Sequence, residues 1–175
     1  RNSSTSVAAR CSVGSGSATV LIVDNDGTIQ FTRAAYSVDE GVGEAVIGVV
    51  RTGNTNRAAS VDYQILDGTA SYGADYSAAQ TNGTLQFAPG EVFQEIRLSI
   101  VDDTVVEPVE TISLVLTNPT GGLPLGGQRT ATLSIIDNDI SFQFVTNHFR
   151  GNENAGYAVI SVERLGQTNA AASVV

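Results

Sequence analysis

Residues 18–31, ATVLIVDNDGTIQF, recur as residues 131–144, ATLSIIDNDISFQF. The second copy begins 113 residues after the first, and the same offset carries Arg51 to Arg164. A repeat of this length is a whole domain rather than one turn of a solenoid. We therefore predict a tandem array with partial units at both ends: the C-terminal end of a preceding unit at residues 1–27, a complete unit at 28–139, and the N-terminal strands of a following unit at 140–175.

Apolar and polar residues alternate with a period of two, which is typical of strands. In residues 92–100, for example, one face carries Val92, Ile96, Leu98 and Ile100. Turns rich in Gly, Asn and Pro separate these runs. We predict seven strands, near residues 29–38, 44–52, 59–66, 84–87, 92–101, 110–117 and 129–136. This pattern indicates an all-β fold, a seven-stranded antiparallel β-sandwich of the immunoglobulin-like type, and the irregular stretch 67–82 makes a barrel the weaker alternative.

The composition is acidic, with 18 Asp and Glu against nine basic residues, all of them Arg, and a net charge of −9. Such a chain repels nucleic acid and anionic membrane surfaces, so we expect neither as a partner. No run approaches the roughly 18 apolar residues that cross a bilayer, so we expect no membrane insertion. The acidity suits a cation-binding protein, and it equally suits a secreted protein that is only kept soluble by its charge.

The acidic residues gather where predicted strands end, and ends that share a rim of a sandwich converge in space. Converging carboxylates repel one another unless a cation neutralises them, and calcium accepts six to eight oxygen ligands in irregular geometry. His and Cys are absent near these positions, which makes zinc, copper and iron poor candidates. The alternative is that the acids are separate, solvated loop residues. The acidic positions are Glu40, Asp75, Asp102, Asp103, Glu107, Glu110, Asp137 and Asp139.

An ordered series of motifs across residues 28–139 resembles the Calx-β domain family. The motifs are Asp67-Gly68-Thr69-Ala70, Gly73-Ala74-Asp75-Tyr76, Gly83-Thr84-Leu85-Gln86-Phe87, Pro89-Gly90-Glu91, Ile100-Val101-Asp102-Asp103, Glu107-Pro108-Val109-Glu110 and Ile136-Asp137-Asn138-Asp139. The resemblance implies calcium ions at one rim of the sandwich, beside the junction with the next domain. It implies as ligands the carboxylates of Glu40, Asp75, Asp102, Asp103, Glu107, Glu110, Asp137 and Asp139 and the backbone carbonyl of Val105.

The chain departs from the family's richest acidic pattern. Asn138 stands where a third Asp is found, Thr104 follows Asp103 where another Asp is common, and Pro108-Val109 replace acids. Fewer charges imply one or two weaker sites, which suit the millimolar calcium outside cells.

We expect a calcium-binding structural or adhesive repeat of a large extracellular or cell-surface protein, with calcium stiffening the junctions between domains. The expected partners are neighbouring repeats of the same chain, or identical chains in a filament. Two alternatives stay open: a calcium-independent sandwich that assembles into a filament by strand exchange, and an adhesin that binds carbohydrate or another cell-surface ligand. We expect no enzyme, because the single histidine, His148, is predicted in a surface loop without a catalytic partner.

Overall fold

The computed structural model describes residues 8–13, 16–21, 26–168 and 171–174. Within them the only helical segments are two single 3₁₀ turns, η1 (Glu40–Val42) and η2 (Glu153–Ala155). No helix in this described part is long and apolar enough to span a bilayer. The strands are β1 (Ala8–Val13), β2 (Gly16–Leu21), β3 (Ile29–Phe31), β4 (Ala35–Asp39), β5 (Glu44–Arg51), β6 (Ala59–Asp67), β7 (Tyr76–Ser77), β8 (Asn82–Phe87), β9 (Phe93–Ile100), β10 (Glu110–Thr117), β11 (Thr130–Ile136), β12 (Ile140–Phe144) and β13 (Val162–Gly166).

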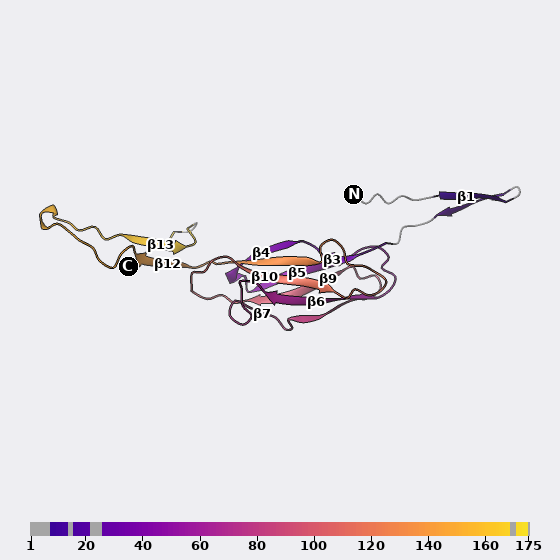
Figure 1. The fold of residues 1–175 in the computed structure, drawn as a ribbon, viewed down its shortest axis with the longest axis horizontal. Helices are drawn as coiled ribbons and strands as arrows, with labels where there is room; N and C mark the ends of the chain where they lie inside the picture. The colour runs from indigo at the N-terminus through magenta and orange to yellow at the C-terminus, as the bar shows by residue number, and fades with distance from the viewer. Residues whose placement is uncertain (1–7, 14–15, 22–25, 169–170, 175) are drawn as a thin grey trace.

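Strands β3 to β11 form a sandwich of two sheets (Figure 1). One sheet has the order β3-β5-β9-β7 and the other has the order β4-β11-β10-β6-β8. The predicted all-β sandwich is therefore confirmed. Neighbouring strands of both sheets pair antiparallel, except that β4 pairs parallel with β11.

The predicted first strand, residues 29–38, divides into β3 and β4, which belong to different sheets. The backbone N–H of Thr32 still donates to Gly48 O of β5 (2.9 Å), whereas Ala34 O already accepts from Thr132 N of β11 (3.0 Å). The chain thus crosses from one sheet to the other within residues 32–34. This crossing, together with the two-residue strand β7, is why the sandwich has more strands than the seven that the alternation predicted.

The core between the sheets consists of the inward-facing residues of both. Burying a Val, Leu, Ile or Phe side chain stabilises a fold by about 1.5–3 kcal/mol. The predicted shared face of Ile96, Leu98 and Ile100 is buried, but Val92 lies outside it, 47% exposed, because β9 begins only at Phe93. The side chains exposed by 1% or less include Ile29, Phe31, Ile47, Val49, Val61, Phe87, Leu98, Ile112, Leu114, Leu116 and Leu133.

The irregular stretch between β6 and β8 is tied to the start of β10. The backbone N–H of Thr111 donates to Thr69 Oγ1 (2.8 Å), and Thr111 O accepts from Ala70 N (3.1 Å). Gly68 makes this approach feasible, because a β-carbon at this position would lie 2.4 Å from Thr111 O. These contacts place the loop that carries Asp75 against the strand that begins with Glu110.

Two hairpins flank the sandwich at opposite ends, β1–β2 and β12–β13 (Figure 1). The C-terminal hairpin repeats the register of β3 with β5 at the offset of 113 residues. Phe144 and Val162 are 64% and 46% exposed, whereas the equivalent Phe31 and Val49 are fully buried. The equivalent pairs are Phe142–Arg164 and Phe144–Val162 in the hairpin, and Ile29–Arg51 and Phe31–Val49 in the sandwich. The equivalent DND of residues 24–26 lies mostly outside the described residues.

Replacement of Gly68 by alanine should destabilise the sandwich. The new methyl group would push Thr111 away, and overpacking of this kind costs about 1–3 kcal/mol. Urea unfolding followed by circular dichroism measures the change. Gly127→Ala is the matched control, because no atom lies within 4 Å of its β-carbon position. Equal free energies of unfolding for the two variants would contradict the close packing of Gly68 on Thr111.

Candidate metal centre

Seven carboxylates gather at the end of the sandwich from which β12 leaves. They come from segments far apart in the sequence, because the ends of β4, β9 and β11 and the start of β10 lie at the same rim. Glu40 follows β4, Asp75 precedes β7, and Glu110 opens β10. Asp103 and Glu107 lie in the loop after β9, and Asp137 and Asp139 connect β11 to β12.

These seven residues form three overlapping groups, in each of which the ligand oxygens lie within 4.8 Å of one another. Glu40 and Glu107 each belong to two groups, so the groups make one continuous cluster rather than separate sites. The groups are Glu40–Asp137–Asp139, Glu40–Asp103–Glu107 and Asp75–Glu107–Glu110.

Glu40 lies at the centre of the cluster and is only 6% exposed. Its Oε1 accepts one hydrogen bond, from Asp103 N (3.2 Å). A carboxylate that loses most of its hydration and gains a single backbone donor is costly to ionise. A bound cation would remove that cost.

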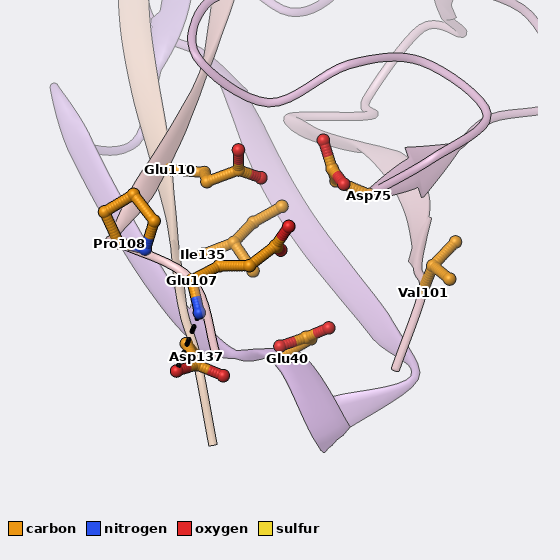
Figure 2. Close-up of a pocket in the computed structure, with 8 residues that line it drawn as sticks. All are labelled: Glu40, Asp75, Val101, Glu107, Pro108, Glu110, Ile135 and Asp137. Atoms are coloured by element: carbon orange, nitrogen blue, oxygen red, sulfur yellow. Dashed lines mark hydrogen bonds between the residues drawn. The ribbon is translucent and has the colours of Figure 1, made fainter. Parts of the chain in front are cut away.

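A small cavity of about 10 Å³ lies among the carboxylates. That volume is close to the least that holds one water-sized sphere. Figure 2 shows the side chains of Glu40, Asp75, Glu107 and Glu110 pointing toward this common space. Val101, Pro108 and Ile135 form its apolar walls, and Asp137 completes the lining. The space is therefore lined by oxygen donors and is of the size of a single ion.

Backbone N–H groups hold the carboxylates in place but leave oxygens available to a ligand. Asp137 Oδ2 accepts from Glu107 N (3.2 Å), and Asp137 Oδ1 accepts from Asp139 N (2.9 Å). Asp103 Oδ1 accepts from Val105 N (2.6 Å). Asp139 Oδ2 is buried and has no hydrogen-bond partner within the described chain. A buried carboxylate oxygen without a partner is rare in folded proteins, and a cation satisfies it.

The electrostatics of the cluster oppose ionisation. Loss of hydration, followed by the charge and a hydrogen bond of Asp75, raises the pKa of Glu110 to about 7. Loss of hydration is also the largest cause that raises the pKa of Glu40, of Glu107 and of Asp139, and the neighbouring carboxylates add to it. The cluster thus binds protons more tightly than ordinary surface acids do, as expected of groups prepared for a cation.

The donor set consists of oxygen atoms, without a His or Cys side chain in any of the three groups. Hard cations prefer such ligands, and the irregular arrangement of several carboxylates suits calcium better than magnesium, which requires near-octahedral geometry. These residues therefore fit a calcium ion.

Seven of the nine predicted ligands lie together, and Asp102 is the one predicted carboxylate that does not join the groups. Asp102 is exposed and its Oδ1 accepts from Asn138 Nδ2 (3.3 Å), so it lies beside the connector. Val105 has a 55% exposed side chain and donates its N–H to Asp103; its carbonyl stays a predicted ligand. The alternation of apolar and polar residues did not indicate that Val101 and Pro108 line the cavity. His148 is exposed, as predicted.

Comparison with known proteins identifies the relatives of this chain. The sequence profile of the Calx-beta domain matches residues 23–139 and again residues 136–175. The chain is 37% identical over 136 residues to the sodium/calcium exchanger Calx of Drosophila melanogaster, a match that covers 77% of this chain and 14% of the exchanger. It is 32% identical over 154 residues to the extracellular matrix organizing protein FRAS1 of Mus musculus, covering 84% of this chain and 4% of that protein.

Among solved structures, the apo form of the Calx CBD1 domain matches with a TM-score of 0.61 and 38% sequence identity. The match covers 65% of this chain and 99% of the CBD1 chain. The fold of the sandwich is thus that of a whole CBD1 domain, whereas the chain spans only a small part of the two full-length relatives.

Without a divalent cation, the stability of the fold should fall as the pH rises. The folded-state pKa of Glu110 lies at about 7, above its ordinary value of 4.5, so the folded state binds this proton more tightly than the unfolded state. The resulting stabilisation is complete below the unfolded pKa and is lost as the pH rises through about 7. Thermal melts in chelator from pH 5 to pH 8 should therefore show a decreasing melting temperature.

Glu110→Gln should weaken this pH dependence and raise the melting temperature at pH 8. Glu153→Gln is the control, because Glu153 lies exposed in the C-terminal segment, away from the sandwich core. A slope that is the same in Glu110→Gln and in the unaltered chain would show that Glu110 is already ionised at neutral pH.

Proposed function

Because the chain belongs to the Calx-beta domain family, we propose that its carboxylate cluster binds calcium and that the chain is a structural or adhesive repeat whose junctions are stiffened by that ion. Calx-beta domains are calcium-binding domains, and the Drosophila relative is named a sodium/calcium exchanger. This structural or adhesive role requires no catalytic chemistry. The stiffening, the repeat array and the location of the protein are our proposals.

The observation that carries the proposal is that seven carboxylates lie close together, with their oxygens in three overlapping groups. Solvated surface acids would spread apart, because like charges a few Å from one another repel strongly. Here Glu40 is buried at the centre and Asp139 Oδ2 is buried without a partner among the described residues. Holding these groups together therefore lowers the stability of the fold, and a bound calcium ion would restore it.

The position of the cluster supports a role at the junction between repeats. Asp137 and Asp139 contribute ligand oxygens, and β12 begins at the very next residue, Ile140. An ion held by both the sandwich and the connector restricts the angles between them. We propose residues 1–27, 28–139 and 140–175 as the end of one unit, a complete unit and the start of the next. The family profile matches residues 23–139 and 136–175, which supports the complete unit and the following one.

We propose an extracellular or cell-surface location, with neighbouring repeats as the main partners. The relative FRAS1 is named an extracellular matrix organizing protein, which supports this class of environment. Millimolar calcium outside cells would occupy even weak sites. A carbohydrate or another cell-surface ligand held at the acidic rim through calcium is the adhesive form of this proposal.

Assembly by strand exchange is a second candidate role, favoured by one observation. The apolar residues of β12–β13 are exposed although their counterparts in the sandwich are buried. Exposed strand pairs of this kind bind further strands. The strands that complete the hairpin would come from a following stretch of the same protein or from an identical chain, and the latter arrangement would build a filament.

Calcium should raise the melting temperature of the chain. At a concentration of 100 times the Kd, binding stabilises a fold by about 2.7 kcal/mol, which is a shift on the order of 5–10 °C for a protein of this size. Scanning calorimetry with millimolar calcium and with chelator measures it, and magnesium should produce a much smaller shift.

The variants Asp137→Asn and Glu107→Gln should each remove most of that shift, because they belong to the three groups. Asp39→Asn is the matched control, since Asp39 is the exposed neighbour of Glu40 and belongs to none of these groups. Loss of the calcium effect in Asp39→Asn as well would point to nonspecific screening of charge rather than to a site.

The array should be longer and more rigid with calcium than without it. Small-angle scattering of the chain in calcium and in chelator compares the maximum dimension and the radius of gyration. We expect both to fall in chelator, because the connector at residues 137–139 gains freedom. Identical scattering curves would eliminate the stiffening while leaving calcium binding itself intact.

A further inference from the structure

The turn after β13 is bound to the connector that carries the last two carboxylates. Gln167 makes both contacts: its side-chain Nε2 donates to Asp137 O (3.0 Å), and its backbone N–H donates to Asp139 O (3.1 Å). Both acceptors are main-chain carbonyls, so the carboxylates of Asp137 and Asp139 remain available. The contact therefore fixes the backbone of the connector without occupying its ligand oxygens.

Gly166 brings the turn close enough for these bonds. It has a φ of +83°, and a β-carbon on it would lie 2.1 Å from Asp139 O. A left-handed backbone conformation and this close approach both require glycine. The turn thus lies directly against the carbonyl of a residue whose carboxylate belongs to the cluster.

We propose that Gln167 is a positioning residue for the cation cluster, so that the segment following the sandwich sets how tightly the cluster binds calcium. This inference rests on the proposed calcium site. The connector leaves the sandwich after β11, and its backbone would lose further freedom when the ion binds. Two hydrogen bonds that fix it beforehand reduce that entropic cost, as partners of metal ligands commonly do.

The repeat provides an internal comparison, because the offset of 113 residues places Asn54 where Gln167 stands. The two turns are built alike: Arg51 Nη2 donates to Asn54 O (2.9 Å), and Arg164 Nη2 donates to Gln167 O. The side chains differ, since Asn54 is one methylene shorter and its Oδ1 accepts from Asn56 N (2.9 Å) within its own turn. In the C-terminal turn the longer amide of Gln167 donates to Asp137 O of the acidic connector, whereas the Oδ1 of Asn54 accepts a hydrogen bond within its own turn.

The test compares Gln167→Ala with Asn54→Ala in the full chain, using calcium titrations by isothermal calorimetry. Asn54 follows the end of β5 that is remote from Glu40, so Asn54→Ala should leave the Kd unchanged. Gln167→Ala should weaken calcium binding about three- to tenfold, the change expected from one lost hydrogen bond. The melting temperature in chelator should be the same for Gln167→Ala and the unaltered chain, because Gln167 lies outside the sandwich core.

Hydrogen exchange gives a second readout that a purely structural role would not change. Coupling is reciprocal, so calcium should slow exchange of the residue-167 amide, and less so in Gln167→Ala. An unchanged Kd in Gln167→Ala, or an equal loss in Asn54→Ala, overturns the positioning role and leaves the calcium site standing. An unaltered chain that gives no calcium heat overturns both.

Discussion

Repulsion among carboxylates at one end of the sandwich is the constraint around which the rest of the structure is arranged. The groups belong to strand ends, so they cannot separate without displacing strands whose apolar faces form the core. Glu40 bears part of this cost, because it lies in η1 and is buried within the cluster. The stability of the hydrophobic core is what allows the cluster to persist without a counter-charge, since the burial of many apolar side chains outweighs a few unfavourable charges.

The same constraint explains why the loops at this end are well connected to one another. Asp103, Asp137 and Glu40 each accept a hydrogen bond from a backbone N–H of the cluster's own loops. The loop of Asp75 is held against β10 through Thr69 and Thr111. The cluster is therefore held by backbone donors, and each carboxylate keeps further lone pairs with which it can bind a ligand. Carboxylates scattered over a surface would not need these backbone hydrogen bonds.

The sequence predicted the sandwich and most of the cluster because both depend on local, periodic signals. Alternation located the buried faces of β9, β10 and β11, and the acids at strand ends located seven residues that the structure brings together. The division of residues 29–38 was not predictable from alternation, because Thr32 continues the pairing of one sheet while Ala34 already belongs to the other. Asp102 and Asp103 are adjacent acids of the same type, and only the path of the chain after β9 places Asp103 beside Glu40 and Asp102 beside Asn138. Gln167 was missed for a similar reason: its contact is with main-chain carbonyls, which carry no residue identity.

The hairpin β12–β13 has the register of β3–β5 although it lacks the second sheet against which those strands pack. A ribosome synthesises a chain from its N-terminus to its C-terminus, and domains fold largely in that order. The finished sandwich already offers the carbonyls of Asp137 and Asp139 to the emerging turn at Gly166 and Gln167. In the proposed array, each completed unit would act as a template that sets strand pairing in its successor before the successor's own core exists. Folding would then propagate along that array in one direction, and an error in one connector would be passed on to the unit that is synthesised after it.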